Sequence, residues 1–270
     1  MQAAVMIPAF DRPEMVWLCL DHLALCREVI DMQIHVCIDG RDGHAPLDEF
    51  IAATSAHPDL PIELHVGPAH YYHGNSFNVL NAYRTAYDAG ADLIYLVEDD
   101  VMVLPQFFAW HIAVQERPGA VGPFGVRVGT SVGVRNPGHG AYASLGVCHD
   151  RNTVEDILEH AVPRYFRDMR GYCARTFPPS PFDCEQDGLI ARVIAGCTVA
   201  WADPPVCSHI GWYGYHRKRT PRPTGTLAER VQKVRDAFGE CFPGGAADVE
   251  LHTATNTGTY TLSTVPGRAA

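Results

Sequence analysis

Apolar residues follow two patterns in the first hundred residues of the chain. Short continuous apolar runs are typical of buried strands, whereas apolar residues at helical spacing predict amphipathic helices. Strands are expected at residues 3–7, 34–38, 62–66 and 93–97, and helices at 14–27, 47–56 and 75–89. Pro13 favours the start of the first helix and Gly90 the end of the third, because proline fits a first turn and glycine a C-terminal cap.

The second half of the chain is less regular. Residues 119–146 are rich in Gly and Val and predict short strands and turns. Helices are expected at 153–170, with a break at Pro163, at 187–195 and at 226–238, and a strand at 198–202. Residues 211–226 predict a loop, and the Gly, Ala and Thr that dominate from Pro243 onward predict a loosely packed tail.

The alternation of strands and helices predicts an α/β fold, with a Rossmann-like, mostly parallel sheet flanked by helices in a single domain. Ligands bind such sheets beyond the carboxyl ends of the strands. Polar residues stand directly after three of the expected strands. We expect them to converge on one edge of the sheet: Asp11, Arg12, Asp39, Glu98, Asp99 and Asp100.

Composition and charge narrow the class of protein. The chain has 270 residues, 47% of them hydrophobic, and its formal net charge of −10 argues against a general attraction to nucleic acid or anionic membranes. Its 9 cysteines form no CxxC pair, so neither a disulfide framework nor a cysteine zinc site is indicated. No basic and apolar leader opens the chain, and no apolar stretch reaches the roughly 20 residues of a membrane span. We therefore expect no signal peptide, no membrane span and a cytoplasmic location.

Three consecutive acids, Glu98, Asp99 and Asp100, stand between two apolar runs in the segment LIYLVEDDVMVLPQFF. Burial of so much like charge is costly unless a counter-charge compensates it. A divalent cation with oxygen ligands, Mn²⁺ or Mg²⁺, would compensate it and would also bind a diphosphate. The alternative is a solvated turn in which one acid caps a helix. The position at the end of a buried strand favours the metal and nucleotide interpretation.

The segment LVEDDVMVLPQFF resembles the metal-binding segment of N-acetylglucosaminyltransferase I-like enzymes and, more broadly, the DxD motif of GT-A glycosyltransferases. The resemblance extends to glycosyltransferase family 2-like enzymes and implies a GT-A-type fold. It implies that Asp100 is a metal ligand, that Asp99 contacts the ribose and that Glu98 contacts the donor.

Two N-terminal segments agree with this resemblance. VMIPAFDRPEM resembles the first strand and loop of GT-A enzymes, which line the nucleotide base, and HGNSFNVLNAYRTAYDAG resembles the helix before the acidic motif. Each segment also has a purely structural interpretation, as a strand–Pro–turn junction, an Asp-Gly turn or a core helix. The donor-binding residues that the resemblance implies here are Pro8, Ala9, Phe10, Arg12, Asp39 and Arg84, with Asn75 and Asn78 as further candidates.

The segment FDCEQDGLIARVIAGCTVAWADPPVCSHIG resembles the acidic catalytic motif of GT-A enzymes, followed by a strand and a metal-binding histidine. His209 matches that histidine, although a single histidine is more commonly structural. A carboxylate of the acidic cluster would remove the proton from the acceptor hydroxyl. We favour Asp187 as this base, then Glu185, with Asp183 as a third candidate. Gln186 interrupts the usual Glu-Asp pair, and helix capping is the alternative role of these acids.

The segment GWYGYHRKRTPR, which follows His209, combines aromatic and basic residues. Basic side chains suit diphosphate and aromatic rings suit sugar faces, so this segment resembles a lid over the donor. Trp212, Arg217 and Lys218 are the donor contacts it implies. A solvated basic loop and a local contact with a nucleic-acid acceptor are the two alternatives.

Together these observations predict a metal-dependent glycosyltransferase with an inverting mechanism. Its donor would be a nucleotide-diphosphate sugar, with a UDP-sugar favoured, and its acceptor a small molecule, glycan, protein or modified nucleic acid. Residues 1–225 would form the catalytic domain, with a nucleotide-binding half at 1–100 and an acceptor half at 101–225, and residues 226–270 a C-terminal helix and tail. The alternatives are a sugar-1-phosphate nucleotidyltransferase, although PAFDRPEM lacks the glycines of that class, and a catalytically inactive nucleotide-sugar-binding module.

Overall fold

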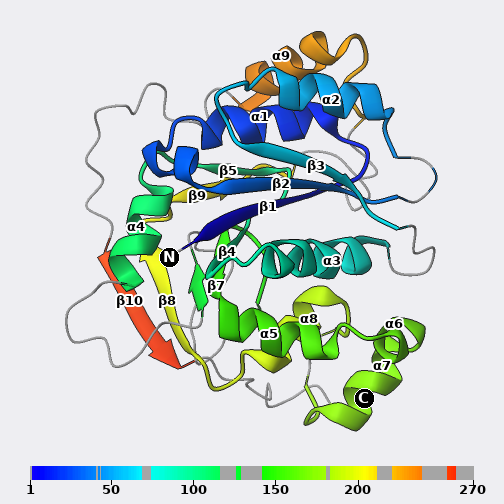
Figure 1. The fold of residues 1–270 in the computed structure, drawn as a ribbon, viewed down its shortest axis with the longest axis vertical. Helices are drawn as coiled ribbons and strands as arrows, with labels where there is room; N and C mark the ends of the chain where they lie inside the picture. The colour runs from blue at the N-terminus through cyan, green and yellow to red at the C-terminus, as the bar shows by residue number, and fades with distance from the viewer. Residues whose placement is uncertain are drawn as a thin grey trace.

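The computed structural model describes residues 2–40, 42, 44–68, 74–115, 126–128, 142–180, 183–211, 221–238 and 254–259. Eight strands form its central sheet (Figure 1). They are β1 (Ala3–Ala9), β2 (Gln33–Ile38), β3 (Ile62–Val66), β4 (Leu93–Leu96), β6 (Val126–Val128), β7 (Val147–Asp150), β8 (Thr198–Asp203) and β10 (Ala254–Thr259). Their order across the sheet is β10-β8-β6-β7-β4-β1-β2-β3.

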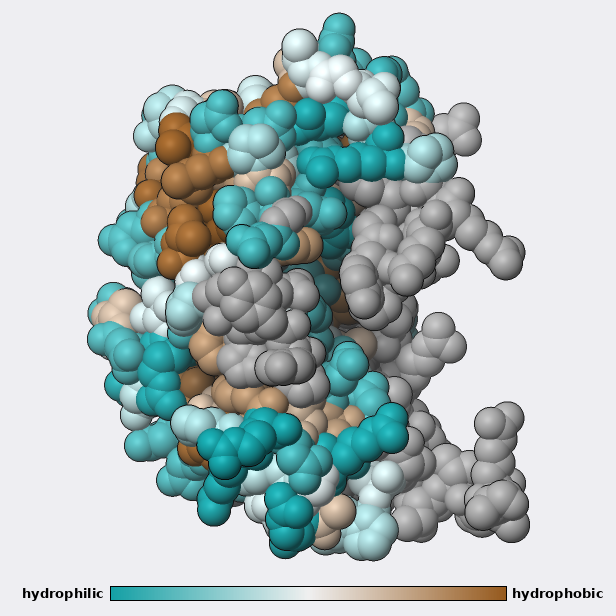
Figure 2. Space-filling view, turned by 90° about the vertical axis from the view of Figure 1, so that its right-hand side faces the viewer, coloured by the Kyte–Doolittle hydropathy of each residue, from teal (hydrophilic) through white to brown (hydrophobic). Residues whose placement is uncertain are grey.

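Six of these eight strands run in one direction. β3, β2, β1 and β4 pair in parallel, and so do β6 and β8, whereas β7 and β10 are antiparallel to their neighbours. The expectation of a mostly parallel sheet is therefore confirmed. β1 runs toward the right-hand side of Figure 1, which faces the viewer in Figure 2, and hydrophilic residues predominate on the described surface of that side.

Helices cover both faces of the sheet (Figure 1). Successive residues of a strand point to opposite faces, so Val5 and Ile7 of β1 join one hydrophobic core and Ala4 and Met6 join the other. The first core includes residues of α1 (Pro13–Leu23), α2 (Leu47–Ser55), α4 (Phe107–Gln115) and α9 (Leu227–Phe238). The second includes residues of α3 (Gly74–Asp88), α5 (Arg151–His160), α6 (Pro163–Arg167), α7 (Met169–Thr176) and α8 (Gln186–Val193).

The observed ends of the first helix and the first strand differ from the expected ones. The first helix ends at Leu23 instead of continuing to residue 27, and a separate 3₁₀ turn follows at Arg27–Asp31. β1 continues through Pro8 to Ala9, beyond the expected end at residue 7. The reason is that β4 pairs with β1 only as far as Met6, so that Pro8, which has no N–H group, lies beyond the hydrogen bonds on that side.

A two-stranded ribbon that the hydrophobic pattern did not predict lies beside the main sheet. β5 (Val101–Val103) and β9 (Cys207–His209) pair antiparallel, with Val101 opposite His209. The N–H group of Ile210 donates to the carbonyl oxygen of Asp100 at 2.9 Å. The ribbon therefore fixes the backbone of the expected metal histidine beside the acidic triplet.

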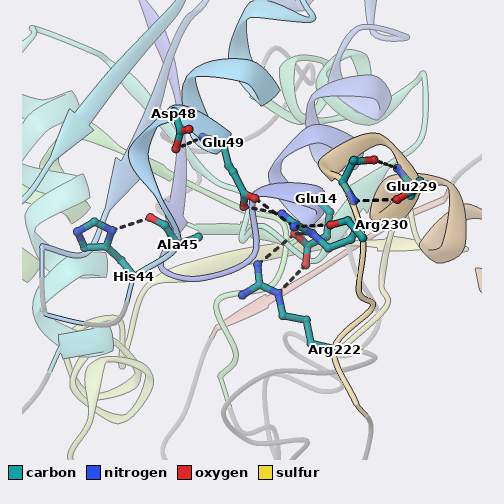
Figure 3. Close-up of polar contacts among 10 residues, drawn as sticks. Glu14, His44, Ala45, Asp48, Glu49, Arg222, Glu229 and Arg230 are labelled. Carbon is teal, nitrogen blue, oxygen red and sulfur yellow. Dashed lines mark hydrogen bonds and ion pairs between the residues drawn. The ribbon is translucent and has the colours of Figure 1, made fainter.

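Ion pairs join the C-terminal helix α9 to α1 and α2 (Figure 3). Glu14 of α1, which is 0% exposed, accepts from Arg222 at 3.1 Å and from Arg230 at 3.2 Å. Arg230 also donates to both carboxylate oxygens of Glu49 on α2.

The tail expected from residue 243 contributes β10, which pairs with β8. Within the described ranges, no helix combines the length and apolar character that crossing a membrane requires.

Candidate active site

Arg12 and two of the three consecutive acids meet where β1 and β4 end. The Nε atom of Arg12 donates to Asp99 at 3.0 Å, and Nη1 donates to Asp100 at 2.9 Å. The Nη2 atom makes a second contact with the Asp99 carboxylate. Because β1 and β4 are parallel neighbours, their carboxyl ends meet at one edge, and the predicted convergence of Arg12 with the acids is confirmed.

Burial and neighbouring charges shift the pKa values of the three acids in different directions. Burial, followed by repulsion from Asp100 and Asp187, raises the pKa of Glu98 well above its ordinary value. Burial also raises the pKa of Asp99 to about 7, against the opposing charge of Arg12. For Asp100, burial opposes ionisation, but Arg12 and His209 outweigh it and lower the pKa to about 2.

The guanidinium of Arg12 provides part of the compensation that the acids need. From the sequence we expected a metal ion to supply it and Arg12 to lie along the nucleotide base. The structure directs the guanidinium of Arg12 onto Asp99 and Asp100, while the metal ion and the contact of Arg12 with the base stay predictions. Two carboxylates contact this guanidinium, and the charge of Asp100 also acts on the neighbouring Glu98, so an additional cation would be favoured whenever all three acids ionise.

His209 lies against Asp100 and completes a pair of potential metal ligands. Its Nε2 atom is 3.3 Å from Oδ2 of Asp100. The Oδ1 atom of Asp100 is buried and has no hydrogen-bond partner among the described residues. Two adjacent ligands of an octahedral ion, each about 2.1 Å from it, lie about 3.0 Å apart. The spacing and the unpaired buried oxygen therefore fit a shared divalent cation.

Asp187 stands in the first turn of α8 and is the most shielded acid of its cluster. Ser144 Oγ donates to Asp187 Oδ1 at 2.5 Å. Burial raises the pKa of Asp187 to about 6, while the Ser144 hydrogen bond acts in the opposite direction. Glu185 and Asp183 are both exposed, and Asp183 accepts the backbone N–H of Glu185 at 3.2 Å. Of the three predicted bases, Asp187 is therefore the one that the fold shields from solvent.

The start of α8, and with it Asp187, is held against α3. Gln186, the residue that interrupts the expected Glu-Asp pair, accepts from Ser76 Oγ at 2.6 Å and donates its N–H back to that hydroxyl at 3.2 Å. Gly188 is also required here, because a side-chain carbon would lie 2.1 Å from the carbonyl oxygen of Asp183. The departure from the family pattern at Gln186 thus has a positioning role.

Four expected donor-binding residues lie at the carboxyl ends of β1 and β2. Pro8 and Ala9 are buried in β1, Phe10 is half-buried, and Asp39 is 4% exposed. The N–H group of Asp39 donates to the carbonyl oxygen of Ala9 at 2.8 Å. Asn78 of α3 fixes both strand ends, since its Nδ2 atom donates to the carbonyl oxygens of Cys37 at 2.9 Å and Ala9 at 3.3 Å. Their contact with a donor remains a prediction.

Arg84 is not brought to this group. It is exposed and donates to the carbonyl oxygen of Leu158 on α5 at 3.4 Å. It lies ten residues after Gly74, the first residue of α3, and therefore about 15 Å along the helix axis. Trp212, Arg217 and Lys218 lie outside the residues that the structure describes.

A buried polar chain behind Asp187 could not be recognised from the sequence. Tyr83 and Tyr142 hydrogen-bond to the two ring nitrogens of His149, at 2.8 and 3.3 Å. Ser144 follows Tyr142 by two residues and reaches Asp187. These residues come from α3, β7 and the segment before β7, and no periodic pattern marks Ser144 in its Gly-rich surroundings.

No model of a known protein family matches the chain, and neither does any curated protein sequence. Solved structures do match. TarS 1-349 from S. aureus in complex with UDP-GlcNAc has a TM-score of 0.55 at 12% identity, covering 93% of this chain and 77% of TarS. The mannosyltransferase PcManGT from Pyrobaculum calidifontis, in complex with GDP-Man and Mn²⁺, has a TM-score of 0.53 at 14% identity. The fold is of the GT-A type.

The same fold relates this chain to a third structure. The galactosyltransferase LgtC, in complex with donor and acceptor sugar analogs, has a TM-score of 0.52 at 10% identity and covers 85% of this chain and 95% of LgtC. The match with PcManGT covers 90% of this chain but only 65% of PcManGT, so this chain spans about two thirds of the length of that protein. At these identities the likeness establishes the GT-A architecture alone.

Proposed function

We propose that this chain is a metal-dependent glycosyltransferase that moves a sugar from a nucleotide-diphosphate donor to an acceptor hydroxyl with inversion. The observation that carries the proposal is the pairing of Asp100 with His209 at 3.3 Å, beside a buried carboxylate oxygen with no described partner. The proposal is supported by the GT-A fold, since the three similar structures are a mannosyltransferase, TarS with UDP-GlcNAc and a galactosyltransferase.

Asp100 and His209 would hold the divalent cation, Mn²⁺ or Mg²⁺. The low pKa of Asp100 keeps this carboxylate ionised at neutral pH, as a ligand must be. The cation would neutralise the charge that develops on the leaving diphosphate. Arg12 orients the Asp100 carboxylate through its hydrogen bond at 2.9 Å to Oδ2, the same oxygen that faces His209.

Asp187 would act as the base. Its ionised carboxylate takes the proton of the acceptor hydroxyl while the acceptor oxygen bonds to the anomeric carbon and the bond from that carbon to the diphosphate oxygen breaks. A base with a pKa near the working pH is the most effective, and the pKa of about 6 meets this requirement. The influence of the Asp187 charge on the raised pKa of Glu98 supports this role, because it indicates that Asp187 is close to the acids that follow β4.

The donor contacts remain part of the proposal. Glu98, Asp99, Asp39 and Phe10 stand at the edge where the nucleotide would bind, with Trp212, Arg217 and Lys218 proposed from the sequence resemblance alone. A UDP-sugar is the first donor to test, with a GDP-sugar next because PcManGT was solved with GDP-Man. The acceptor remains one of the four hydroxyl-bearing classes named above.

A donor screen tests this function. The protein is incubated with Mn²⁺ and each common nucleotide sugar, and release of nucleoside diphosphate is measured. We expect release from at least one donor. Release from none of them, together with no thermal shift in the presence of any donor, would contradict the proposal.

The substitution Asp187→Asn tests whether the chain is an enzyme or a catalytically inactive binding module. An enzyme that uses Asp187 as its base should lose about 10²–10⁴-fold in turnover and keep its donor affinity, because the amide preserves size but cannot accept the proton. Glu159→Asn, at an exposed position of α5, is the matched control and should keep full turnover. Unchanged turnover in Asp187→Asn would move the base to another residue.

A further inference from the structure

A second group of potential metal ligands lies on β2 and β3, at the opposite end of the sheet order from β10. His35 of β2 pairs with Glu63 of the edge strand β3, and Cys37 pairs with His65. His35 also pairs with Met6 of β1, whose side chain joins the core beneath α3. Directly paired residues of parallel strands point to the same face, so His35, Glu63 and His65 all lie on the α3 face of the sheet.

The three ligand atoms form a compact triangle. The Nδ1 atom of His35 is 3.0 Å from Nε2 of His65 and 3.6 Å from Oε2 of Glu63, and Nε2 of His65 is 3.5 Å from the same oxygen. Ligands at about 2.0–2.1 Å from a tetrahedral ion lie about 3.3 Å from one another. The three separations bracket this value, so one ion can contact all three atoms with little movement of the side chains.

The burial of the three side chains suits such a site. The His35 side chain is 2% exposed, that of His65 33% and that of Glu63 57%. The buried His35 ring directs Nδ1 into the triangle, and its other nitrogen, Nε2, has no hydrogen-bond partner among the described residues. The innermost ligand is therefore fixed by packing, while the outer two leave one side of the triangle open to solvent.

We propose that His35, Glu63 and His65 bind a divalent transition-metal ion of the Zn²⁺ class, with water in the open fourth position. Two imidazoles and one carboxylate favour Zn²⁺ over Mg²⁺, which prefers oxygen ligands. The three residues lie within β2 and β3, whereas the proposed catalytic cation would be held by Asp100, which precedes β5, and by His209 of β9. The site would therefore tie the edge strand β3 to β2, independently of glycosyl transfer.

Calorimetric titration with Zn²⁺ alone tests this proposal. In the background of His209→Ala, which weakens the catalytic cation site, we expect one Zn²⁺ to bind to the intact triad. Adding His65→Ala should weaken this binding at least ten-fold, because a three-ligand site becomes a two-ligand site. His160→Ala, which removes a half-buried histidine of α5, is the matched control and should leave Zn²⁺ binding unchanged.

Two further measurements make the test decisive. Glu63→Gln removes a ligand from a largely exposed position, so it should weaken Zn²⁺ binding without affecting the fold, and circular dichroism checks that the fold is retained. A Co²⁺-loaded sample should show visible d–d bands without thiolate charge transfer, which excludes the cysteines as ligands. Zn²⁺ binding that is unchanged in both His65→Ala and Glu63→Gln, or thiolate charge transfer with Co²⁺, would overturn the proposal.

Discussion

A carboxylate that takes a proton from an acceptor hydroxyl must itself be ionised, so the pKa of Asp187 sets the lower pH limit of the proposed reaction. Burial raises this pKa to about 6 in the free protein. We therefore expect kcat/KM to rise with pH up to about pH 6 and then to level off, and to fall about ten-fold for each unit below it. A pH–rate profile measures this directly.

A substitution of Ser144 tests whether the pKa of Asp187 sets the lower pH limit of the reaction. Its hydroxyl stabilises the ionised form of Asp187 through the hydrogen bond at 2.5 Å, so removing the hydroxyl should raise the pKa of Asp187. In Ser144→Ala the acidic limb of the profile should move to higher pH, while the rate at high pH falls less than in Asp187→Asn. A limb that stays in place would show that another group controls it.

Only some of the residues in the candidate site could be predicted from the sequence. Arg12 and the acids were expected to converge because each follows a strand of one parallel sheet, and this topological rule held. The ion pairs of Arg12 with Asp99 and Asp100 were not predicted, because the sequence pattern places residues at an edge of the sheet without giving the directions of their side chains. Ser144 was missed entirely, since a lone serine in a Gly-rich segment has no periodicity that would mark it.

At the scale of elements, the charged group between α1, α2 and α9 carries a stability prediction. Glu14 is fully buried and holds Arg222 and Arg230 (Figure 3). Glu14→Gln would leave these guanidinium groups without their shared carboxylate. Breaking a buried ion pair in this way costs about 3–5 kcal/mol, so we expect a loss of that order in the free energy of unfolding, measured by urea denaturation.

The control for this prediction is Glu159→Gln on α5, where the acid is exposed. A surface change of this kind should alter the free energy of unfolding by less than about 0.5 kcal/mol. If Glu14→Gln were as mild as its control, the contacts of Glu14 would contribute little to the docking of α9.

Element prediction succeeded where the periodic signal was long and failed where it was short. α3 and α9 were expected at nearly their observed positions, because each has several turns of apolar spacing. β5 and β9 each have three residues, too few for a pattern, yet their pairing brings His209 to Asp100. The proposed metal ligands could therefore be named from a family resemblance, but their contact depends on a pairing that only the folded chain shows.

At the scale of the molecule, one continuous sheet connects the two halves of the proposed site. Arg12, Asp99 and Asp100 lie just after β1 and β4, whereas Asp187 stands on α8, before β8, and His209 stands on β9, after β8. The sheet therefore supports both the cation ligands and the base on one framework. The GT-A topology explains this placement, because strands that are distant along the chain end at a common edge.

The central claim is that Asp100 and His209 hold a cation that binds the donor diphosphate. Its most direct measurement is calorimetric binding of UDP and of GDP, with and without Mn²⁺, to the unmodified chain, His209→Ala and Asp100→Asn. We predict that Mn²⁺ strengthens binding of at least one nucleotide ten-fold or more, and that either substitution removes this gain. An equal gain from Mn²⁺ in all three proteins would contradict the account.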